Sequence, residues 1–394
     1  MVQGDVAREA SLLDRPDAEL AASVDAVLER FVGGGSVVGA VTMVARHGAL
    51  VYCRAFGHAD REAGRTMTVD TPFRLASLTK PFVTAATLAL VERGLIKLDD
   101  PVARWLPDFR PRLPDGWEPV ITLRHLMTHT SGLGYGFQQG AEGPYRRAEV
   151  SDGIDRPAFG IDENLRRLAS VHLNFDPGAG WLYSLATDVL GRVLEAATES
   201  SLPEVVRTAI TDPLGLRESG FVSGSPERLA VPYADSPVGP VRMGDPHDLP
   251  FGDGSIRFAP SRAVDADVYP SGGAGMVGTA ADTLALLETL RAGGGPVLGR
   301  SSIDALTRNA VGDMASQGIG AGWGFGLGVA VLVDPAAAAT PQSAGTWRWG
   351  GVYGHNWFVD PAERLVVLTM TNTAVAGMNG PIREAVRDAV YAVG

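Results

Sequence analysis

Ser77 and Lys80 stand three residues apart, and a serine with a nearby amine can carry out acyl transfer. A serine hydroxyl attacks an acyl carbon only when a base or a group that stabilises the oxyanion assists it. Lys97 is the only other lysine among the 34 basic side chains. An amine, unlike a guanidinium, exchanges a proton near neutral pH when it is buried. The pair predicts a nucleophile with its base, and a capping serine beside a solvated lysine is the alternative.

The apolar segment after Ser77 predicts how the two side chains meet. Residues 81–86 continue as a strongly apolar helix to Glu92. If Ser77 begins this helix, Lys80 lies one turn on and on the same face, with its amine within reach of the hydroxyl. The helix N-terminus also presents a free backbone N–H to a developing oxyanion.

Two later segments supply partners for this pair. Tyr183 follows the turn-rich residues 176–180 and precedes a helix. Beside a lysine ammonium, a tyrosine can act as general base toward Ser77 and then as general acid toward the leaving alcohol. A half-buried aromatic with a hydrated hydroxyl is the alternative. In Trp349-Gly350-Gly351-Val352 a strand runs into glycines that let backbone approach a substrate, so the Val352 N–H is the expected second oxyanion donor.

The elements that must position these residues come from both ends of the chain. Helical spacing of apolar residues predicts a helix over 16–31, and residues 37–46 and 50–56 are typical of an antiparallel hairpin. Later strands are predicted over 323–333, 346–349, 355–359 and 365–371, before a final helix over 381–393. We therefore expect an α/β fold (α+β) with one antiparallel sheet built from both termini and flanked by helices.

A mainly helical lobe is expected between the two halves of the sheet. The predicted division is residues 1–90 and 265–394 for the α/β domain and 91–264 for the insert. Its helices are predicted over residues 123–128, 162–169, 184–197 and 203–210. Residues 132–155 and 222–270 are rich in Gly, Pro, Ser and Asp, so we expect long loops that cover or line a cleft.

Composition narrows the classes of partner. The 394 residues carry 45 acidic and 34 basic side chains, a net charge of −11, which disfavours nucleic acid and anionic membranes. No apolar run of about 18 residues occurs and residues 1–10 lack a signal-peptide pattern, so a soluble, cytoplasmic protein is expected. Cys53 is the only cysteine, which excludes an internal disulfide and a multi-cysteine zinc site.

Three other patterns are rejected. Residues 273–278 fit a dinucleotide fingerprint, but no strand precedes them. His125 and His129 have the spacing of a metal pair, yet no third ligand is evident. No Gly-x-Ser-x-Gly occurs, which disfavours a nucleophile elbow. We predict no cofactor and no metal.

The Ser-x-x-Lys motif, the later tyrosine and the Gly-Gly strand together resemble the serine β-lactamase and penicillin-binding-protein superfamily. The resemblance is closer to the family VIII carboxylesterases, which share the class C β-lactamase fold. The matching segments are residues 73–80, 129–133, 177–184, 271–276 and 349–351. The resemblance implies that Ser77 is acylated, that Lys80 and Tyr183 share the base role, and that the Ser77 and Val352 N–H groups form the oxyanion hole.

The chain departs from the β-lactamase pattern at two positions. Tyr183-Ser184-Leu185 stands where those enzymes have Tyr-x-Asn, so the amide that would hold a lactam side chain is missing. Trp349 replaces the lysine of Lys-Thr-Gly, so the cation that meets a substrate carboxylate is missing too. Arg348 is not expected to compensate, because neighbouring residues on a strand point to opposite faces. Both changes favour a neutral ester over an anionic lactam or a D-alanyl peptide.

We therefore predict a serine carboxylesterase that hydrolyses small neutral acyl esters through an acyl-enzyme on Ser77, with acyl transfer to an alcohol or amine as a side activity. Trp349, Gly351, Tyr135 and His355 are the expected pocket residues, with a structural role as the alternative for His355. A β-lactamase or D-alanyl-D-alanine carboxypeptidase is the enzymatic alternative. A non-catalytic binding scaffold of the same fold is the other.

Overall fold

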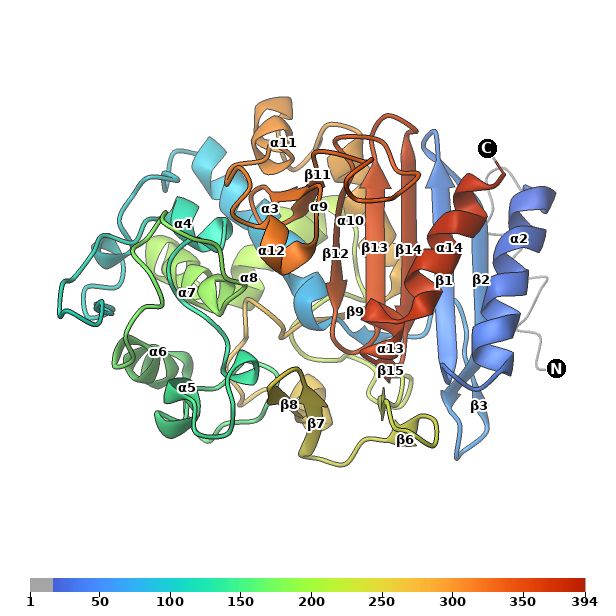
Figure 1. The fold of residues 1–394 in the computed structure, drawn as a ribbon, viewed down its shortest axis with the longest axis horizontal. Coiled ribbons are helices and arrows are strands. Elements are labelled where there is room, and N and C mark those ends of the chain that lie inside the picture. The colour runs from blue at the N-terminus through green and yellow to red at the C-terminus, as the bar shows by residue number, and fades with distance from the viewer. Residues whose placement is uncertain (1–16, 394) are drawn as a thin grey trace.

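An eight-stranded sheet, antiparallel at every pairing, lies at the centre of the computed structural model, which describes residues 17–393 (Figure 1). The strand order is β10-β11-β12-β13-β14-β1-β2-β3. The strands are β1 Gly39–Arg46, β2 Ala49–Asp60, β3 Arg65–Thr66, β10 Trp323–Phe325, β11 Ala330–Leu332, β12 Trp347–Gly351, β13 His355–Asp360 and β14 Leu365–Thr371. Because β14 pairs with β1, the two ends of the chain share one sheet, which confirms the predicted architecture.

Helices cover both faces of this sheet (Figure 1). Helix α2 (Ala18–Leu28) and helix α14 (Pro381–Tyr391) lie side by side on one face. Helices α3 (Thr79–Glu92) and α10 (Ala280–Arg291) lie on the other. The predicted first and last helices are therefore present, although Pro16 and residues 1–10 lie outside the described part of the chain.

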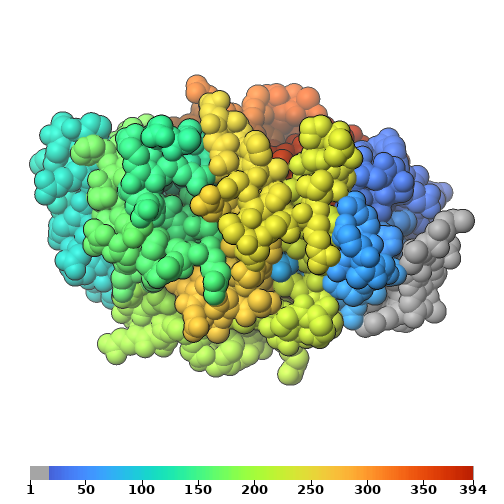
Figure 2. Space-filling model, turned by 90° about the horizontal axis from the view of Figure 1, so that it is seen from below, coloured from blue at the N-terminus to red at the C-terminus, as the bar shows by residue number. Residues whose placement is uncertain are grey.

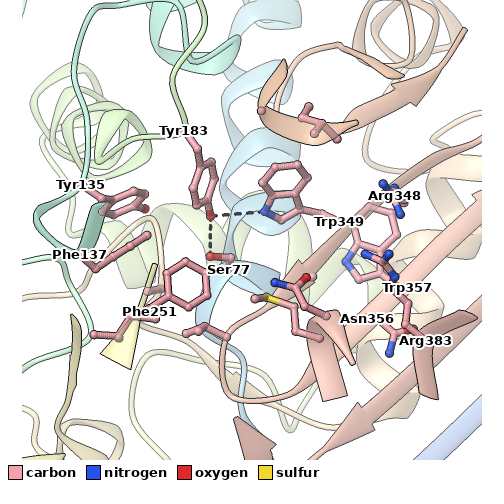
Figure 3. A pocket seen from close by; sticks show the side chains of 18 of the residues that line it. Ser77, Tyr135, Phe137, Tyr183, Phe251, Arg348, Trp349, Asn356, Trp357 and Arg383 are labelled. Carbon is pink, nitrogen blue, oxygen red and sulfur yellow. Dashed lines mark hydrogen bonds between the residues drawn. The ribbon is translucent and has the colours of Figure 1, made fainter. Parts of the chain in front are cut away.

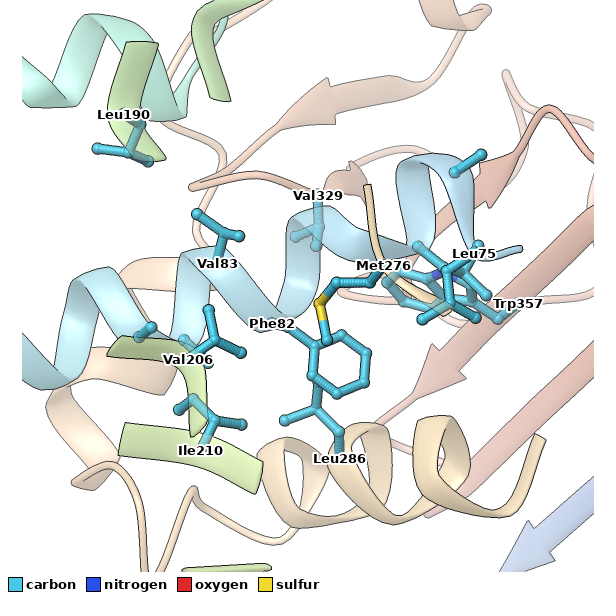
Figure 4. Packing of buried hydrophobic residues seen from close by; sticks show 14 of the residues in the cluster. Leu75, Phe82, Val83, Leu190, Val206, Ile210, Met276, Leu286, Val329 and Trp357 are labelled. Atoms are coloured by element: carbon cyan, nitrogen blue, oxygen red, sulfur yellow. The ribbon is translucent and has the colours of Figure 1, made fainter. Parts of the chain in front are cut away.

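Helix α3 runs through the main hydrophobic core. Every residue from Thr79 to Leu90 is buried, and Figure 4 shows Phe82 of α3 facing Leu286 of α10 and the side chain of Met276. Each such apolar side chain contributes about 1.5–3 kcal/mol when it leaves water. The start of α3, which carries Lys80, is thus held in a fixed place.

The remaining elements are short or belong to the helical part. The helices are α4 Leu123–Met127, α5 Pro144–Arg147, α6 Ile161–Ala169, α7 Ala186–Thr198, α8 Leu202–Val206, α9 Asp212–Leu214, α11 Arg300–Leu306, α12 Ser316–Ile319 and α13 Ala376–Asn379. The strands are β4 Phe73–Arg74, β5 Tyr233–Ala234, β6 Val241–Arg242, β7 His247–Phe251, β8 Gly254–Phe258, β9 Val277–Gly278 and β15 Thr373–Ala374. Across residues 17–393, no helix is both long and apolar enough to cross a membrane.

The helices predicted between the two halves of the sheet are present, while the division of the chain into two domains stays a prediction. Helices α4, α6, α7 and α8 match the four predicted helices within a few residues, except that α8 passes into a π-helical turn, Arg207–Thr211. One buried apolar cluster runs from the sheet through α3 into α7 and α8. The core therefore does not stop where the predicted division of the chain falls.

Two sequence-based predictions are wrong in detail. Residues 323–333 form a hairpin of β10 and β11 instead of one strand. The chain turns at Gly328, whose φ is +83° and whose added Cβ would lie 2.4 Å from Thr84 Oγ1, so only glycine fits there. The loop over 222–270 contains a further hairpin, β7–β8. This loop spans the space between the helical part and the first strands, as Figure 2 shows in yellow between green and blue.

Candidate active site

Ser77 lies on a strained turn that leads directly into α3. A 3₁₀ turn, Ala76–Leu78, precedes the helix. Ala76 has φ +47°, in the left-handed region that costs a non-glycine residue about 1–3 kcal/mol. The turn is held by backbone bonds, since Leu75 N–H donates to the Met276 carbonyl and Leu78 N–H to the Leu75 carbonyl. Such strain is typical of a residue that must be presented in one orientation.

The three residues of the predicted proton circuit meet around the Ser77 hydroxyl. Ser77 Oγ and Tyr183 Oη are 2.6 Å apart (Figure 3). Lys80 Nζ donates to Ser77 Oγ at 3.2 Å, to Tyr135 Oη at 3.0 Å and to the Gly273 carbonyl at 2.9 Å. These contacts use all three protons of an ammonium group. The arrangement can move a proton between serine, tyrosine and amine without a cofactor.

Tyr183 is in contact with an aromatic side chain and a cation. Trp349 Nε1 donates to Tyr183 Oη at 3.3 Å (Figure 3), and Lys80 Nζ lies 4.7 Å from the centre of the Tyr183 ring. Tyr183 therefore has a hydrogen-bond donor at its oxygen and a cation over its ring. Burial, followed by the proximity of Tyr183, raises the pKa of Tyr135 well above its ordinary value. Tyr135 therefore stays a neutral phenol that accepts from Lys80.

Asp188 and Gly273 complete this cluster, and the sequence analysis missed both. A Cβ on Gly273 would lie 2.6 Å from Asp188 Oδ2 and 3.4 Å from Lys80 Nζ, so a side chain there would separate the two charges. Burial raises the pKa of Asp188, and the nearby Lys80 opposes that shift. The five-residue step from Tyr183 to Asp188 into α7 is the one sequence signal that could have pointed to it.

The end of β12 reaches the Ser77 turn because it consists of glycine. A Cβ on Gly351 would lie 2.6 Å from the Leu75 carbonyl oxygen and 3.1 Å from Leu78 Cδ1. Ser77 and Val352 consequently line the same cavity. The close approach places the strand end where a second N–H could meet an oxyanion formed at Ser77.

The cavity beside Ser77 has a volume of about 390 Å³, and aromatic side chains form a large part of its walls. The aromatic residues that line it are Tyr135, Phe137, Trp181, Tyr183, Phe251, Trp349, Trp357 and Phe358. Phe137 and Phe251 come from the two long loops over 132–155 and 222–270, which therefore line a cleft as predicted. An apolar wall of this kind suits an uncharged acyl chain.

Two predicted pocket residues lie behind the cavity wall. Gly351 packs against the Ser77 turn, as described above. His355 is fully buried; its Nε2–H donates to the Arg74 carbonyl at 2.8 Å and its ring meets Phe73 edge to face. Burial lowers the pKa of His355 to about 4. The structure supports the structural role for His355, which does not line the cavity.

Arg348 was not expected in the pocket, yet it lines the cavity. It points away from Trp349, as residues next to each other on a strand must (Figure 3). It nevertheless lines the same cavity, which continues past Gly350 to the other side of β12. The alternation of side chains along the strand predicted the direction of Arg348 correctly. The expectation that Arg348 would therefore lie away from the pocket was wrong, because the cavity extends to it.

Comparison with known proteins agrees with this geometry. Residues 24–391 match the family model described as Beta-lactamase. The chain belongs to the β-lactamase family. It is 56% identical to Esterase EstB of Burkholderia gladioli over 378 residues, 95% of this chain and 96% of that protein. This relative confirms the resemblance to the family VIII carboxylesterases.

Two further relatives extend the comparison. The structure of EstCE1, a hydrolase with promiscuous acyltransferase activity, superposes with a TM-score of 0.92 at 46% identity, covering 95% of this chain and 98% of that one. Monacolin J acid methylbutanoyltransferase of Aspergillus terreus is 31% identical over 310 residues, 73% of this chain and 70% of that protein. The predicted fold class is thus confirmed over almost the whole chain.

Proposed function

We propose that this protein is a serine carboxylesterase that hydrolyses small neutral acyl esters through an acyl-enzyme on Ser77. The observation that carries the proposal is the 2.6 Å contact between Ser77 Oγ and Tyr183 Oη, with Lys80 Nζ on the same hydroxyl at 3.2 Å. The aromatic cavity and the esterase relatives support the substrate class.

The proposed first half-reaction acylates the serine. Tyr183 takes the Ser77 proton while Oγ bonds to the acyl carbon, and the Ser77 and Val352 N–H groups stabilise the resulting oxyanion. Collapse of this intermediate breaks the bond to the alcohol, which receives the proton from Tyr183. Lys80 holds Ser77 Oγ in place during both proton transfers and lies 4.7 Å from the centre of the Tyr183 ring.

The second half-reaction repeats these steps with water. Water gives a proton to Tyr183 as its oxygen attacks the acyl carbon, and Ser77 leaves with that proton. An alcohol in place of water gives a new ester, so acyl transfer is a second activity of the same intermediate. The hydrolase EstCE1 and the methylbutanoyltransferase support this side activity.

A β-lactamase or D-alanyl-D-alanine carboxypeptidase is disfavoured by the cavity wall next to Ser77. Trp349 stands there with its indole on Tyr183, where an anionic lactam would need a cation. A binding scaffold without activity is disfavoured by the complete Ser77, Lys80 and Tyr183 cluster. A cytoplasmic location stays a prediction from the sequence alone, and cell fractionation would test it.

A fluorophosphonate probe tests the proposal. Mass spectrometry should locate one adduct on Ser77, and Ser77→Ala should lose both the adduct and the hydrolysis of a nitrophenyl butyrate ester. Ser170→Ala is the matched control, since its hydroxyl donates to the Arg167 carbonyl at the exposed end of α6. Full ester hydrolysis by Ser77→Ala would contradict the mechanism.

A further inference from the structure

The cavity that begins at Ser77 has a second end with a different chemical character. Arg348 of β12 lines it there together with Arg383 and Arg387 of α14. Figure 3 shows Arg348 and Arg383 on the far side of Trp349 from Ser77. Three guanidiniums from two elements therefore converge on one part of a cavity whose other end is aromatic.

Arg348 has no anionic partner in the described protein. Within residues 17–393 its guanidinium makes no hydrogen bond or ion pair, and it stacks on the Trp323 ring with Cζ 3.9 Å from the ring centre. Burial, followed by the positive charges of Arg383 and Arg387, lowers the pKa of Arg348 to about 9, and the carboxylate of Glu384 opposes this shift. A half-buried cation with two like charges nearby and no hydrogen-bonded anion is unfavourable, and an anion that joins it relieves the repulsion.

The two helix arginines do not relieve this excess of charge. Arg383 pairs with its neighbour Glu384 at 3.3 Å, and Arg387 pairs with its neighbour Asp388. Both carboxylates are well exposed, with side chains 59% and 58% accessible. Neither acid lines the cavity, so the cluster remains cationic on the side that faces the cavity.

We propose that this end of the cavity binds a carboxylate that the substrate carries remote from its scissile ester. The inference rests on the proposed esterase function and adds to its substrate class. A planar carboxylate matches the donor fork of a guanidinium and relieves the repulsion among the three arginines. The aromatic end still takes an uncharged ester group, so one substrate is neutral at Ser77 and anionic at its other end. The carboxylate belongs to either the acyl half or the alcohol half.

Matched pairs of esters test the subsite and identify the half that carries the charge. For the acyl half, kcat/KM is compared between the nitrophenyl monoester of suberic acid and nitrophenyl octanoate. For the alcohol half, the butyrate ester of hydroxyhexanoic acid is compared with hexyl butyrate. At least one carboxylate ester should exceed its neutral partner by about tenfold or more, the usual share of a charged hydrogen bond. The advantage should shrink in about 0.5 M salt.

Variants assign the effect to the arginines. Arg348→Gln should lower the ratio of carboxylate to neutral kcat/KM by about fivefold or more. Arg300→Gln should leave the ratio unchanged, because Arg300 is 76% exposed and pairs with Asp304 outside the cavity. If Arg348→Gln does not fold, Arg383→Gln provides the same readout.

The outcomes separate this inference from the proposed function. A ratio of one or below for both ester pairs in the wild-type protein overturns the carboxylate subsite, and so does an unchanged ratio in a folded Arg348→Gln or Arg383→Gln variant. If the wild-type protein hydrolyses none of the four esters, the proposed function is overturned instead.

Discussion

Replacing Lys80 by arginine keeps the positive charge and removes the amine, so it separates two contributions of this side chain. Lys80 Nζ contacts Ser77 Oγ, Tyr135 Oη and the Gly273 carbonyl within 3.2 Å. A planar guanidinium on a longer side chain cannot reproduce three divergent contacts at a site where Lys80 is only 1% exposed. It also holds its proton at every pH of interest.

The expected loss follows from the position of Lys80 beside the proton transfer. A positioned acid or base contributes about 10²- to 10⁴-fold to the rate, and the transfer by Tyr183 depends on Lys80 holding Ser77 Oγ in place, so kcat of Lys80→Arg should fall by about that factor. This corresponds to about 3–5 kcal/mol in the activation free energy. The larger side chain also overpacks the site, at about 1–3 kcal/mol of folding stability, so thermal unfolding is measured on the same sample.

Stopped-flow measurement of a nitrophenyl ester separates acylation from deacylation. Both steps should slow in Lys80→Arg, because the amine serves each half-reaction. Lys97→Arg is the matched control and should keep wild-type rates, since Lys97 is exposed and its backbone N–H bonds to Asp100. A folded Lys80→Arg protein with more than a tenth of the wild-type kcat would refute the requirement for an amine that makes these three contacts.

Two other changes test the backbone and the buried histidine. Gly351→Ala should lower kcat about tenfold or more, because its Cβ would lie 2.6 Å from the Leu75 carbonyl oxygen and displace the oxyanion donors. Gly224→Ala is the control and should keep the wild-type kcat, because the space around Gly224 is open. Equal kcat values for the two variants would count against this geometry. His355 has its pKa lowered to about 4, so it is neutral when folded and takes up a proton on unfolding below about pH 6.5. Lowering the pH from 6.5 to 4 should therefore cost the wild-type protein up to about 3 kcal/mol more folding stability than His355→Gln, as urea denaturation would show; matching pH dependences would rule this out.

The sequence predicted what depends on local pattern. The hairpin of β1 and β2 follows from two β-rich segments on either side of a turn at His47-Gly48, and the meeting of Ser77 with Lys80 follows from their three-residue spacing at the start of a helix. The prediction of Tyr183 needed more than local spacing, because Tyr183 lies more than a hundred residues after Ser77 in the sequence. It rested on the family resemblance together with the turn before Tyr183. These predictions hold because each residue is placed by its own element.

Other features depend on which elements pack together. Gly273 matters because its missing side chain lets Lys80 and Asp188 approach each other, and no single-sequence pattern marks that contact. His355 looked like a pocket residue because it is near Gly351 in sequence, yet the β12–β13 pairing turns its ring toward Phe73. The hairpin β7–β8 was hidden in a loop because its strands are short and rich in polar residues.

The replacement of a lysine by Trp349 and the exposure of Arg348 to the cavity are best considered together. In β-lactamases the cation of this strand stands next to the nucleophile, where it meets a carboxylate close to the scissile bond. In this chain an indole occupies that position and hydrogen-bonds Tyr183, while the positive charge lies one residue earlier and on the opposite side of β12. A shift of one residue along a strand moves a side chain to the other face. In the proposed function the cavity therefore disfavours an anion at Ser77 and, in the proposed subsite, accepts one farther away, which is the selectivity that the paired esters measure.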